Sequence, residues 1–300
     1  MNNQIFWLAS YPKSGNTLLR SILIALFFTE DGLFSLDDAY KIRQFETTSH
    51  VYNNNKIFGE DYKNINKINI FYKYLIKLQQ KEALGFNEDF VFMKTHSGAY
   101  EIGGNSFTSQ DNVRGIIYII RDPRDVCVSW SKHSDISIEN SVEFMLNNYS
   151  SLYWTERSRQ KNIFNDKSRP KYLLSSWDNH VLSWTTINWK VPKIILKYED
   201  LVFNKKKILV DLINFFENNY KFNFENKDLK IENILKSTEF KKFQEYEDKK
   251  GFIEATNKNR FFSVGKKDQW KKVLNKTQIL KLEERFKNIM KKFNYKINNN

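Results

Sequence analysis

The fold is decided close to the amino terminus, where the sequence reads Ile5-Phe6-Trp7-Leu8-Ala9-Ser10-Tyr11-Pro12-Lys13-Ser14-Gly15-Asn16-Thr17. The apolar run Ile5–Ala9 predicts a buried strand, and the apolar stretch from about Thr17 to Phe28 predicts a helix. A strand, a tight loop and a helix in this order begin a parallel α/β sheet. We therefore predict an α/β fold with a central parallel β-sheet flanked by helices.

Further short apolar runs predict more strands of the same sheet, at Phe90–Met93, Gly115–Ile120 and Lys193–Lys197. Because these runs are apolar without alternation, we expect the strands to be covered on both faces. Helical periodicity predicts core-facing helices at Leu201–Phe216 and Ile279–Phe293.

The domain organisation follows from the absence of an internal repeat and of a linker rich in Pro, Gly or Ser. We expect one domain over residues 1–300. The polar, Asn-rich stretch 31–88 is predicted to be an insertion on the substrate side, and residues 296–300 are predicted to fray.

Composition excludes several classes of protein. Hydrophobic residues make up 41% of the chain and aromatic residues 16%, so a folded core is expected. A single cysteine excludes a disulfide framework and a cysteine-built zinc site, and it fits a reducing compartment. The apolar run Ser21–Thr29 is half of the ~18 residues that a membrane span needs, and no signal-peptide pattern precedes it. We expect a soluble, cytoplasmic protein without a membrane span.

The formal net charge of +13 favours anionic partners, which include phosphate groups, nucleic acid and acidic lipid. A lysine-rich surface without such a partner is the alternative explanation. No stripe of Arg and Lys interleaved with exposed aromatic residues stands out, so nucleic acid is not an expected partner. The lysine clusters at 205–207 and 266–272 are predicted to be solvated helix faces.

The segment Pro12–Thr17 has the composition of an anion-binding loop. Backbone N–H groups at the start of a helix point at whatever occupies the loop, and the helix dipole favours negative charge there. Lys13 adds a cation, Gly15 permits close approach of the backbone, and the remaining residues add short donors, namely Ser14, Asn16 and Thr17. The spacing is not that of a Walker A loop, because the lysine precedes the glycine. An ordinary helix N-cap is the alternative.

Six segments, in the same order along the chain, resemble those of the sulfotransferases that use 3′-phosphoadenosine 5′-phosphosulfate (PAPS). They are Ser10–Thr17, Phe92-Met93-Lys94-Thr95-His96, Tyr118–Trp130, Trp177–Val181, Lys197–Leu201 and Gly265–Lys271. The resemblance implies a P-loop-like phosphosulfate-binding loop and an enzyme that transfers a sulfonate from PAPS to a hydroxyl or amine acceptor by in-line displacement. The product would be adenosine 3′,5′-bisphosphate (PAP). A nucleotide kinase is the alternative activity, although it needs a lysine after the glycine and a magnesium-binding aspartate.

The resemblance also assigns the catalytic residues. Lys13, with the loop amides, is expected to hold the 5′-phosphate, Lys94 to contact the sulfonate, and His96 to act as general base. The ordinary pKa of histidine, near ~6.5, suits proton transfer at neutral pH. A hydrogen-bonded structural histidine is the alternative for His96, whereas His180 is expected to be a packed neighbour of the site.

Residues expected to bind the nucleotide are, besides the loop residues Lys13, Ser14, Gly15, Asn16 and Thr17, the following: Arg121, Ser129, Tyr198, Thr238, Phe240, Gly265 and Lys266. Arg121 and Ser129 are assigned to the 3′-phosphate, with an ion pair to Asp122 or Asp125 as the alternative for Arg121. The family commonly has Arg-Lys-Gly before its Trp-Lys pair, where this chain has Ser263-Val264-Gly265. Arg260, Lys266 and Lys267 are the candidates to replace those cations, and the sequence does not choose among them.

No metal is expected, because the four histidines are scattered without paired spacing. The acceptor is expected to be a small molecule, a glycan or a lipid. Its pocket is predicted to be lined by segments 31–88, 97–112 and 131–164. Loop aromatic residues would suit an apolar wall, but aromatic residues on a surface are too common to decide it; they are Tyr52, Phe58, Tyr100 and Phe107.

Overall fold

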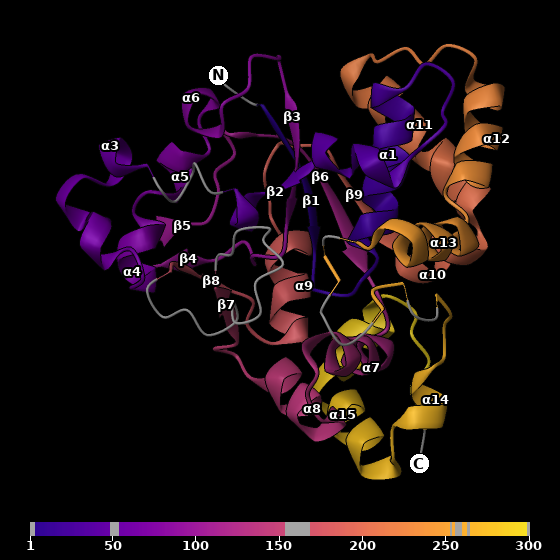
Figure 1. Cartoon of the computed structure of the whole chain (residues 1–300). Coiled ribbons are helices and arrows are strands. Elements are labelled where there is room, and N and C mark those ends of the chain that lie inside the picture. Colours follow the sequence, from indigo (N-terminus) through magenta and orange to yellow (C-terminus); the bar gives the residue numbers. More distant parts are fainter. Residues whose placement is uncertain are drawn as a thin grey trace.

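A five-stranded parallel sheet lies at the centre of the computed structural model, with strand order β2-β3-β1-β6-β9 (Figure 1). The structure describes residues 4–48, 54–153, 169–252, 254–255, 260–262 and 265–298. The sheet strands are β1 (Ile5–Ser10), β2 (Arg43–Gln44), β3 (Val91–Thr95), β6 (Val113–Ile120) and β9 (Lys193–Lys197). Two antiparallel pairs lie outside this sheet, β4 (Glu101–Ile102) with β5 (Asn105–Ser106), and β7 (Ser151–Tyr153) with β8 (Lys171–Leu173).

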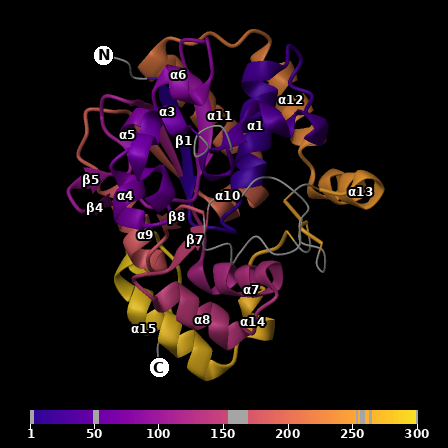
Figure 2. The same cartoon turned by 60° about the vertical axis from the view of Figure 1, so that its left-hand side comes forward.

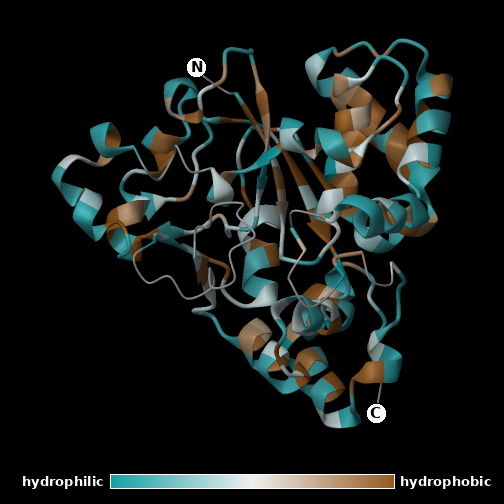
Figure 3. Ribbon diagram, viewed as in Figure 1, coloured by the Kyte–Doolittle hydropathy of each residue, from teal (hydrophilic) through white to brown (hydrophobic). Residues whose placement is uncertain are grey.

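Each face of the sheet carries its own core, because successive side chains of a strand point to opposite faces. In the middle strand, Phe6 and Leu8 join one core, whereas Trp7 and Ala9 join the other. The first core is covered by α1 (Asn16–Phe28), α11 (Lys205–Tyr220), α12 (Lys227–Ser237) and α13 (Phe240–Lys250). The second is covered by α7 (Pro123–Ser134), α8 (Ile138–Leu146), α9 (Trp177–Thr185) and α15 (Lys276–Lys292). Figure 3 shows the apolar strands between these layers, so the predicted α/β fold is confirmed.

The edge strand β9 differs from the sequence prediction. It was expected to be covered on both faces, yet the side chain of Ile195 is 36% exposed. β9 is the last strand of the sheet and has β6 as its sole neighbour among the described strands, so its cover is incomplete.

The helix predicted over Leu201–Phe216 is two helices, α10 (Tyr198–Phe203) and α11, separated at Asn204. The Asn204 backbone leaves the helical region, and its side-chain amide donates to Asp200 Oδ1 at 3.1 Å. Backbone hydrogen bonds continue on both sides of the break, from the Asn204 amide to the Asp200 carbonyl oxygen at 2.8 Å and from the Ile208 amide to the Asn204 carbonyl oxygen at 3.2 Å, so the change is confined to the backbone angles of Asn204.

The stretch 31–88 contributes to the fold itself. It supplies β2 at one edge of the sheet and the short helices α3 (Asn55–Phe58), α4 (Ile68–Tyr72), α5 (Leu75–Leu78) and α6 (Lys81–Leu84). Three 3₁₀ turns complete the segment, η1 (Leu36–Lys41), η2 (Phe45–Thr47) and η3 (Gly59–Asn64). The short helices lie together on the side of the sheet away from α12 and α13 (Figures 1 and 2). Phe58 is 2% exposed and Phe107 is 1% exposed, so these two predicted wall residues are core residues, and Tyr52 lies outside the described residues.

Hydrogen bonds attach Tyr295 and Asn298 to the rest of the fold, whereas residues 299 and 300 of the stretch predicted to fray lie outside the described residues. The Asn298 amide donates to Glu283 Oε2 at 3.1 Å, and the Tyr295 hydroxyl donates to Glu199 Oε2 at 3.1 Å. The short helix α14 (Trp270–Val273) precedes α15.

Within the described part of the chain, no helix has the length and apolar character needed to cross a membrane.

Candidate active site

Three of the predicted site residues, Lys13, His96 and Arg121, follow neighbouring strands at the carboxyl edge of the sheet. β1 lies between β3 and β6, with Ala9 opposite Thr95 and Ser10 opposite Ile119. The loops that follow these three strands are therefore neighbours, as expected for ligand sites in parallel α/β sheets. Two hydrogen bonds join them: the His96 ring nitrogen Nδ1 lies 2.8 Å from the Ser10 carbonyl oxygen, and Arg121 Nη1 donates to the Lys13 carbonyl oxygen at 2.8 Å.

The loop between β1 and α1 has a tightly wound backbone. Lys13 and Gly15 have positive φ angles of 67° and 96°. No side chain caps the start of α1, so the amides of its first turn are available to a ligand in the loop. The buried hydroxyl of Ser14 has no hydrogen-bond partner among the described residues. An unoccupied donor of this kind fits an anionic ligand held by the loop.

Gly15 and Asn16 serve the loop in different ways. A Cβ atom on Gly15 would lie 2.4 Å from the ring of Tyr198, so the glycine permits direct packing of that ring on the backbone. The Asn16 side chain turns back toward β1 and donates to the Leu8 carbonyl oxygen at 2.9 Å. Its role toward a ligand is therefore restricted to its backbone amide, and its side chain braces the loop against the strand.

Glu254, from a distant part of the chain, places its carboxylate beside Lys94 of β3 and Arg20 of α1, which flank this loop. Glu254 Oε2 lies 3.1 Å from Lys94 Nζ and 3.5 Å from the Thr17 hydroxyl, and Glu254 Oε1 lies 2.8 Å from Arg20 Nη1. The Lys13 ammonium lies 4.0 Å from the centre of the Phe261 ring. Burial lowers the pKa of Lys13 to about 7, even though the negative charge of Glu254 acts in the opposite direction.

The His96 ring is oriented by the strand beside it. Because Nδ1 faces a carbonyl oxygen, it carries the ring proton in the neutral form, and Nε2 keeps a lone pair that can accept a proton. Burial and the nearby charge of Lys94 lower the pKa of His96 well below its ordinary value. The pKa of His96 therefore differs from the ordinary value of ~6.5 expected from the sequence. The lower pKa keeps the imidazole in its neutral, basic form at neutral pH.

The backbone around His96 is fixed by a buried carboxylate, Glu46. Its Oε1 accepts hydrogen bonds from the amides of His96 at 3.1 Å and Ser97 at 3.0 Å, and from the hydroxyls of Thr95 and Ser97. On the other side, His180 Nε2 lies 3.0 Å from the His96 carbonyl oxygen. Burial lowers the pKa of His180 to about 4, so this ring is neutral and donates that bond. His180 is thus a packed neighbour of the site, as predicted.

Arg121 lies between Lys13 of the loop and Tyr198, one of the residues predicted to bind adenine. Its guanidinium carbon lies 4.2 Å from the centre of the Tyr198 ring. Among the described residues no carboxylate lies within ion-pair distance of Arg121; Asp122 instead caps α7 and pairs with Arg124 at 2.6 Å. The Asp125 carboxylate accepts hydrogen bonds from the backbone amides of Asp268 and Trp270. These bonds fix the loop before α14 to α7.

The residues predicted to bind adenine lie on α10, at the end of α12 and at the start of α13. A Cβ on Gly265 would lie 2.7 Å from the Phe240 ring, so the two are in direct contact. The Thr238 hydroxyl donates to the Ile234 carbonyl oxygen at 2.6 Å, and Thr238 accepts a bond from Lys205 Nζ at 2.7 Å through its own carbonyl oxygen. These contacts fix the backbone at the end of α12.

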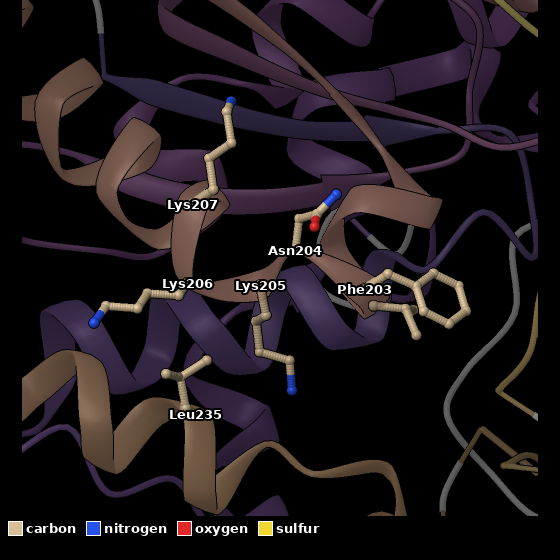
Figure 4. A pocket seen from close by; sticks show the side chains of 7 residues that line it. Phe203, Asn204, Lys205, Lys206, Lys207 and Leu235 are labelled. Carbon is tan, nitrogen blue, oxygen red and sulfur yellow. The ribbon is translucent and has the colours of Figure 1, made fainter.

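The hollow at the start of α11 is lined by Val202, Phe203, Asn204, Lys205, Lys206, Lys207 and Leu235. Figure 4 shows that the three lysine side chains point in different directions. Lys207 pairs with Asp211 at 2.8 Å, and Lys205 bonds to Thr238. Because the charges diverge, the hollow does not form a second anion site.

The three cations considered for the 3′-phosphate, Arg260, Lys266 and Lys267, have different surroundings. Arg260 is paired with Asp248 and donates to the Gln244 carbonyl oxygen at 2.9 Å, so α13 holds it. Lys266 and Lys267 are exposed, and Lys267 Nζ lies 4.8 Å from the Phe203 ring centre. Ser129 is half-buried on α7, and residues 263 and 264 lie outside the described residues.

Comparison with known proteins decides the family. The family model described as "Sulfotransferase domain" matches residues 3–294. The chain belongs to the sulfotransferase family. Luciferin sulfotransferase from Photinus pyralis is 24% identical over 202 residues, which cover 64% of this chain. The match spans about half of that relative's length, at 48%.

Solved sulfotransferase-like structures share the fold. Mouse sulfotransferase SULT7A1, solved with PAP, has a TM-score of 0.55 and 16% identity over 97% of this chain and 84% of its own. Retinol dehydratase, solved with androsterone and the inactive cofactor PAP, has a TM-score of 0.58 and 18% identity over 96% of this chain and 80% of its own. Retinol dehydratase with retinol and PAP has a TM-score of 0.59 and 17% identity over 96% and 81% of the two chains. Family membership favours sulfonate transfer over the kinase alternative.

Four residues that lie against the candidate site were not predicted from the sequence, namely Arg20, Glu46, Glu254 and Phe261. Glu254 and Phe261 are separated from Lys13 by most of the chain, and no local pattern links them. Arg20 could have been found from its position one helical turn after Thr17. Within the described ranges, no group of three or more His, Cys, Asp or Glu side chains is arranged to hold a metal ion.

Proposed function

We propose that this protein transfers a sulfonate from PAPS to a hydroxyl or amine of an acceptor by in-line displacement, with His96 as general base. The observation that carries the proposal is the shared edge at which His96 bonds to Ser10 while Arg121 bonds to Lys13. A base, an anion-binding loop and a second cation thus surround one end of β1. Sulfonate transfer needs these groups, because negative charge develops on the leaving phosphate while the acceptor loses a proton.

In the proposed reaction, the acceptor oxygen or nitrogen attacks sulfur, and the bond from sulfur to the 5′-phosphate oxygen breaks. The acceptor proton moves to Nε2 of His96, and PAP leaves. Lys13, Thr17 and the first amides of α1 hold the 5′-phosphate, and Lys94 contacts the sulfonate. The buried Ser14 hydroxyl, which has no partner among the described residues, supports the fit of an anionic donor to the loop.

We assign the adenosine and 3′-phosphate part of the donor to the side of Arg121 that carries Tyr198, away from Lys13. Arg121 and Ser129 hold the 3′-phosphate, and Tyr198, Thr238 and Phe240 enclose adenine, with Gly265 packed on Phe240. Of the three candidate cations, Lys266 and Lys267 fit the proposal better than Arg260, because Arg260 is already paired with Asp248.

We extend the proposal to the whole chain. Residues 1–300 form one sulfotransferase domain, in which segment 31–88 lines the acceptor side. The acceptor is a small molecule, a glycan or a lipid, and neither a metal nor nucleic acid takes part. The single cysteine fits a cytoplasmic location.

The test is turnover of PAPS by the purified protein in the presence of a metal chelator, with a panel of phenols, alcohols, sugars and amines. We expect PAP to form in amounts equal to the sulfated acceptor. Titration with PAP alone makes the test independent of the acceptor panel. Magnesium-dependent use of ATP, together with no binding of PAP, would contradict the proposal.

A further inference from the structure

Arg20 is a buried cation that the catalytic assignment does not use. It lies on α1 three residues after Thr17, on the same side of the helix, and its side chain is 1% exposed. Its Nη1 atom lies 2.8 Å from Glu254 Oε1, and its Nη2 atom has no hydrogen-bond partner among the described residues. A buried guanidinium is costly unless it is paired, so this position calls for a negative partner.

The negative partner in this structure is a carboxylate shared between two cations. Glu254 places one oxygen near Arg20 and the other 3.1 Å from Lys94, whose side chain is 4% exposed. The Thr17 hydroxyl lies 3.5 Å from the second oxygen. Among the described residues, the Glu254 carboxylate thus lies between two buried cations, Arg20 and Lys94, and the half-buried Lys13 lies near the same loop. The arrangement suits an oxyanion that carries more oxygens and more charge than a carboxylate.

We propose that Arg20 is a binding residue for the phosphosulfate end of the donor, and that Glu254 occupies this oxyanion site until the donor displaces it. The inference rests on the proposed function and extends it to two residues outside the recognised segments. Arg20 and Lys94 thus face the Glu254 carboxylate in the free protein and the donor oxyanion in the complex. Breaking the ion pairs that Glu254 forms with Arg20 and Lys94 opposes donor binding, so the carboxylate lowers the apparent affinity for PAP.

Calorimetric titration with PAP tests the exchange in three variants. Arg20→Gln removes the cation and is expected to weaken PAP binding by about tenfold or more, because hydrogen bonds to charged groups contribute about 1.5–3 kcal/mol. Glu254→Gln removes the competing charge and is expected to tighten PAP binding by about tenfold. Glu245→Gln, an exposed carboxylate on α13, is the matched control and is expected to change the affinity less than about twofold.

Two further choices make the test specific. Work at about pH 6 keeps Lys13 mainly protonated, since its pKa is about 7. Adenosine 3′-monophosphate, which lacks the 5′-phosphate, is the ligand control, and its affinity is expected to be equal in the wild-type and Glu254→Gln proteins. Arg20→Lys keeps the charge and provides a second variant if Arg20→Gln does not fold. Its expected affinity for PAP lies between those of the wild-type protein and the glutamine variant.

The outcomes separate this inference from the proposed function. Weaker PAP binding in Glu254→Gln would overturn the exchange, because it would make the carboxylate part of the binding structure. Unchanged PAP affinity in both Arg20 variants would remove Arg20 from the site. Failure of the wild-type protein to bind PAP would instead overturn the proposed function itself.

Discussion

His96 Nδ1 lies 2.8 Å from the carbonyl oxygen of Ser10, the last residue of β1, so the sheet itself sets the tautomer of the proposed base. The second ring nitrogen is left with its lone pair, which is the form that accepts a proton from an acceptor. The same strand leads into the loop that holds Lys13, so base and cation share one support. Their relative position depends on the sheet and not on a mobile surface loop.

The first prediction concerns His96→Ala. Removing a positioned base is expected to lower kcat by about 10²–10⁴-fold. The affinity for PAP is expected to stay within about twofold, because the imidazole contacts the acceptor side. Steady-state rates and calorimetry measure the two quantities. A variant that retains more than half of the wild-type kcat would place the base elsewhere.

The second prediction is a loss of donor affinity as the pH rises through 7. Lys13 has a pKa of about 7, so its positive charge is lost above this pH. Each further pH unit is expected to weaken PAP binding by up to about tenfold. His96, whose pKa is lowered well below its ordinary value, stays neutral throughout this range. The measurement is the Kd of PAP as a function of pH.

Lys13→Arg is the control for that profile, because arginine keeps its charge throughout. Its PAP affinity is expected to vary little between about pH 6 and pH 9. If the arginine variant shows the same slope as the wild-type protein, the titrating group is not Lys13.

The third prediction makes Glu46 a positioning residue for His96. All four hydrogen bonds go to Oε1 of Glu46, and its buried Oε2 has no hydrogen-bond partner among the described residues. Glu46→Gln therefore keeps an acceptor oxygen at the Oε1 position, but it replaces the carboxylate with a neutral amide and so weakens the bonds to the backbone at His96 and Ser97. We expect kcat to fall about tenfold, with unchanged PAP affinity and a loss of about 1–3 kcal/mol in the free energy of unfolding. Glu60→Gln, at an exposed position of the same segment, is the control.

A purely structural role for Glu46 would give a different result. The fraction of folded protein would then fall, while kcat per folded molecule and its pH profile would match those of the wild-type enzyme. Titration of the binding sites with PAP gives the fraction of folded protein by which kcat is divided.

The fourth prediction compares two glycines of positive φ. Gly15→Ala places a Cβ 2.4 Å from the Tyr198 ring, whereas Gly59→Ala meets no atom within 4 Å. Both substitutions place a Cβ at a position of positive φ, 96° at Gly15 and 55° at Gly59, which strains the backbone, but Gly15→Ala also displaces Tyr198 and is expected to abolish measurable PAP binding. Equal PAP affinities in the two variants would show that the contact with Tyr198 is unimportant for the donor.

The sheet could be predicted from sequence because its strands are short apolar runs, each followed by a recognisable loop. The edge strand β2 could not, because Arg43–Gln44 is too short and too polar to give a strand pattern, and pairing with β3 alone defines it. The break at Asn204 was also missed, since the apolar periodicity continues across it.

In the site, Lys13, His96 and Arg121 could be placed together because the ends of parallel strands meet at one edge. Glu254 could not be placed, because its contact with Lys94 spans 160 residues and depends on the course of the chain after α13. The depressed pKa of Lys13 was equally hidden, since burial causes it.

A crystal structure of the protein with PAP bound would locate the donor site. We expect the 5′-phosphate in the loop between β1 and α1, within hydrogen-bond distance of Lys13 and the Ser14–Thr17 amides, with the 3′-phosphate beside Arg121. Nε2 of His96 should face the open side of the 5′-phosphate, where the sulfonate and the acceptor meet. PAP bound at another face, or with its 5′-phosphate away from Lys13, would contradict this expectation.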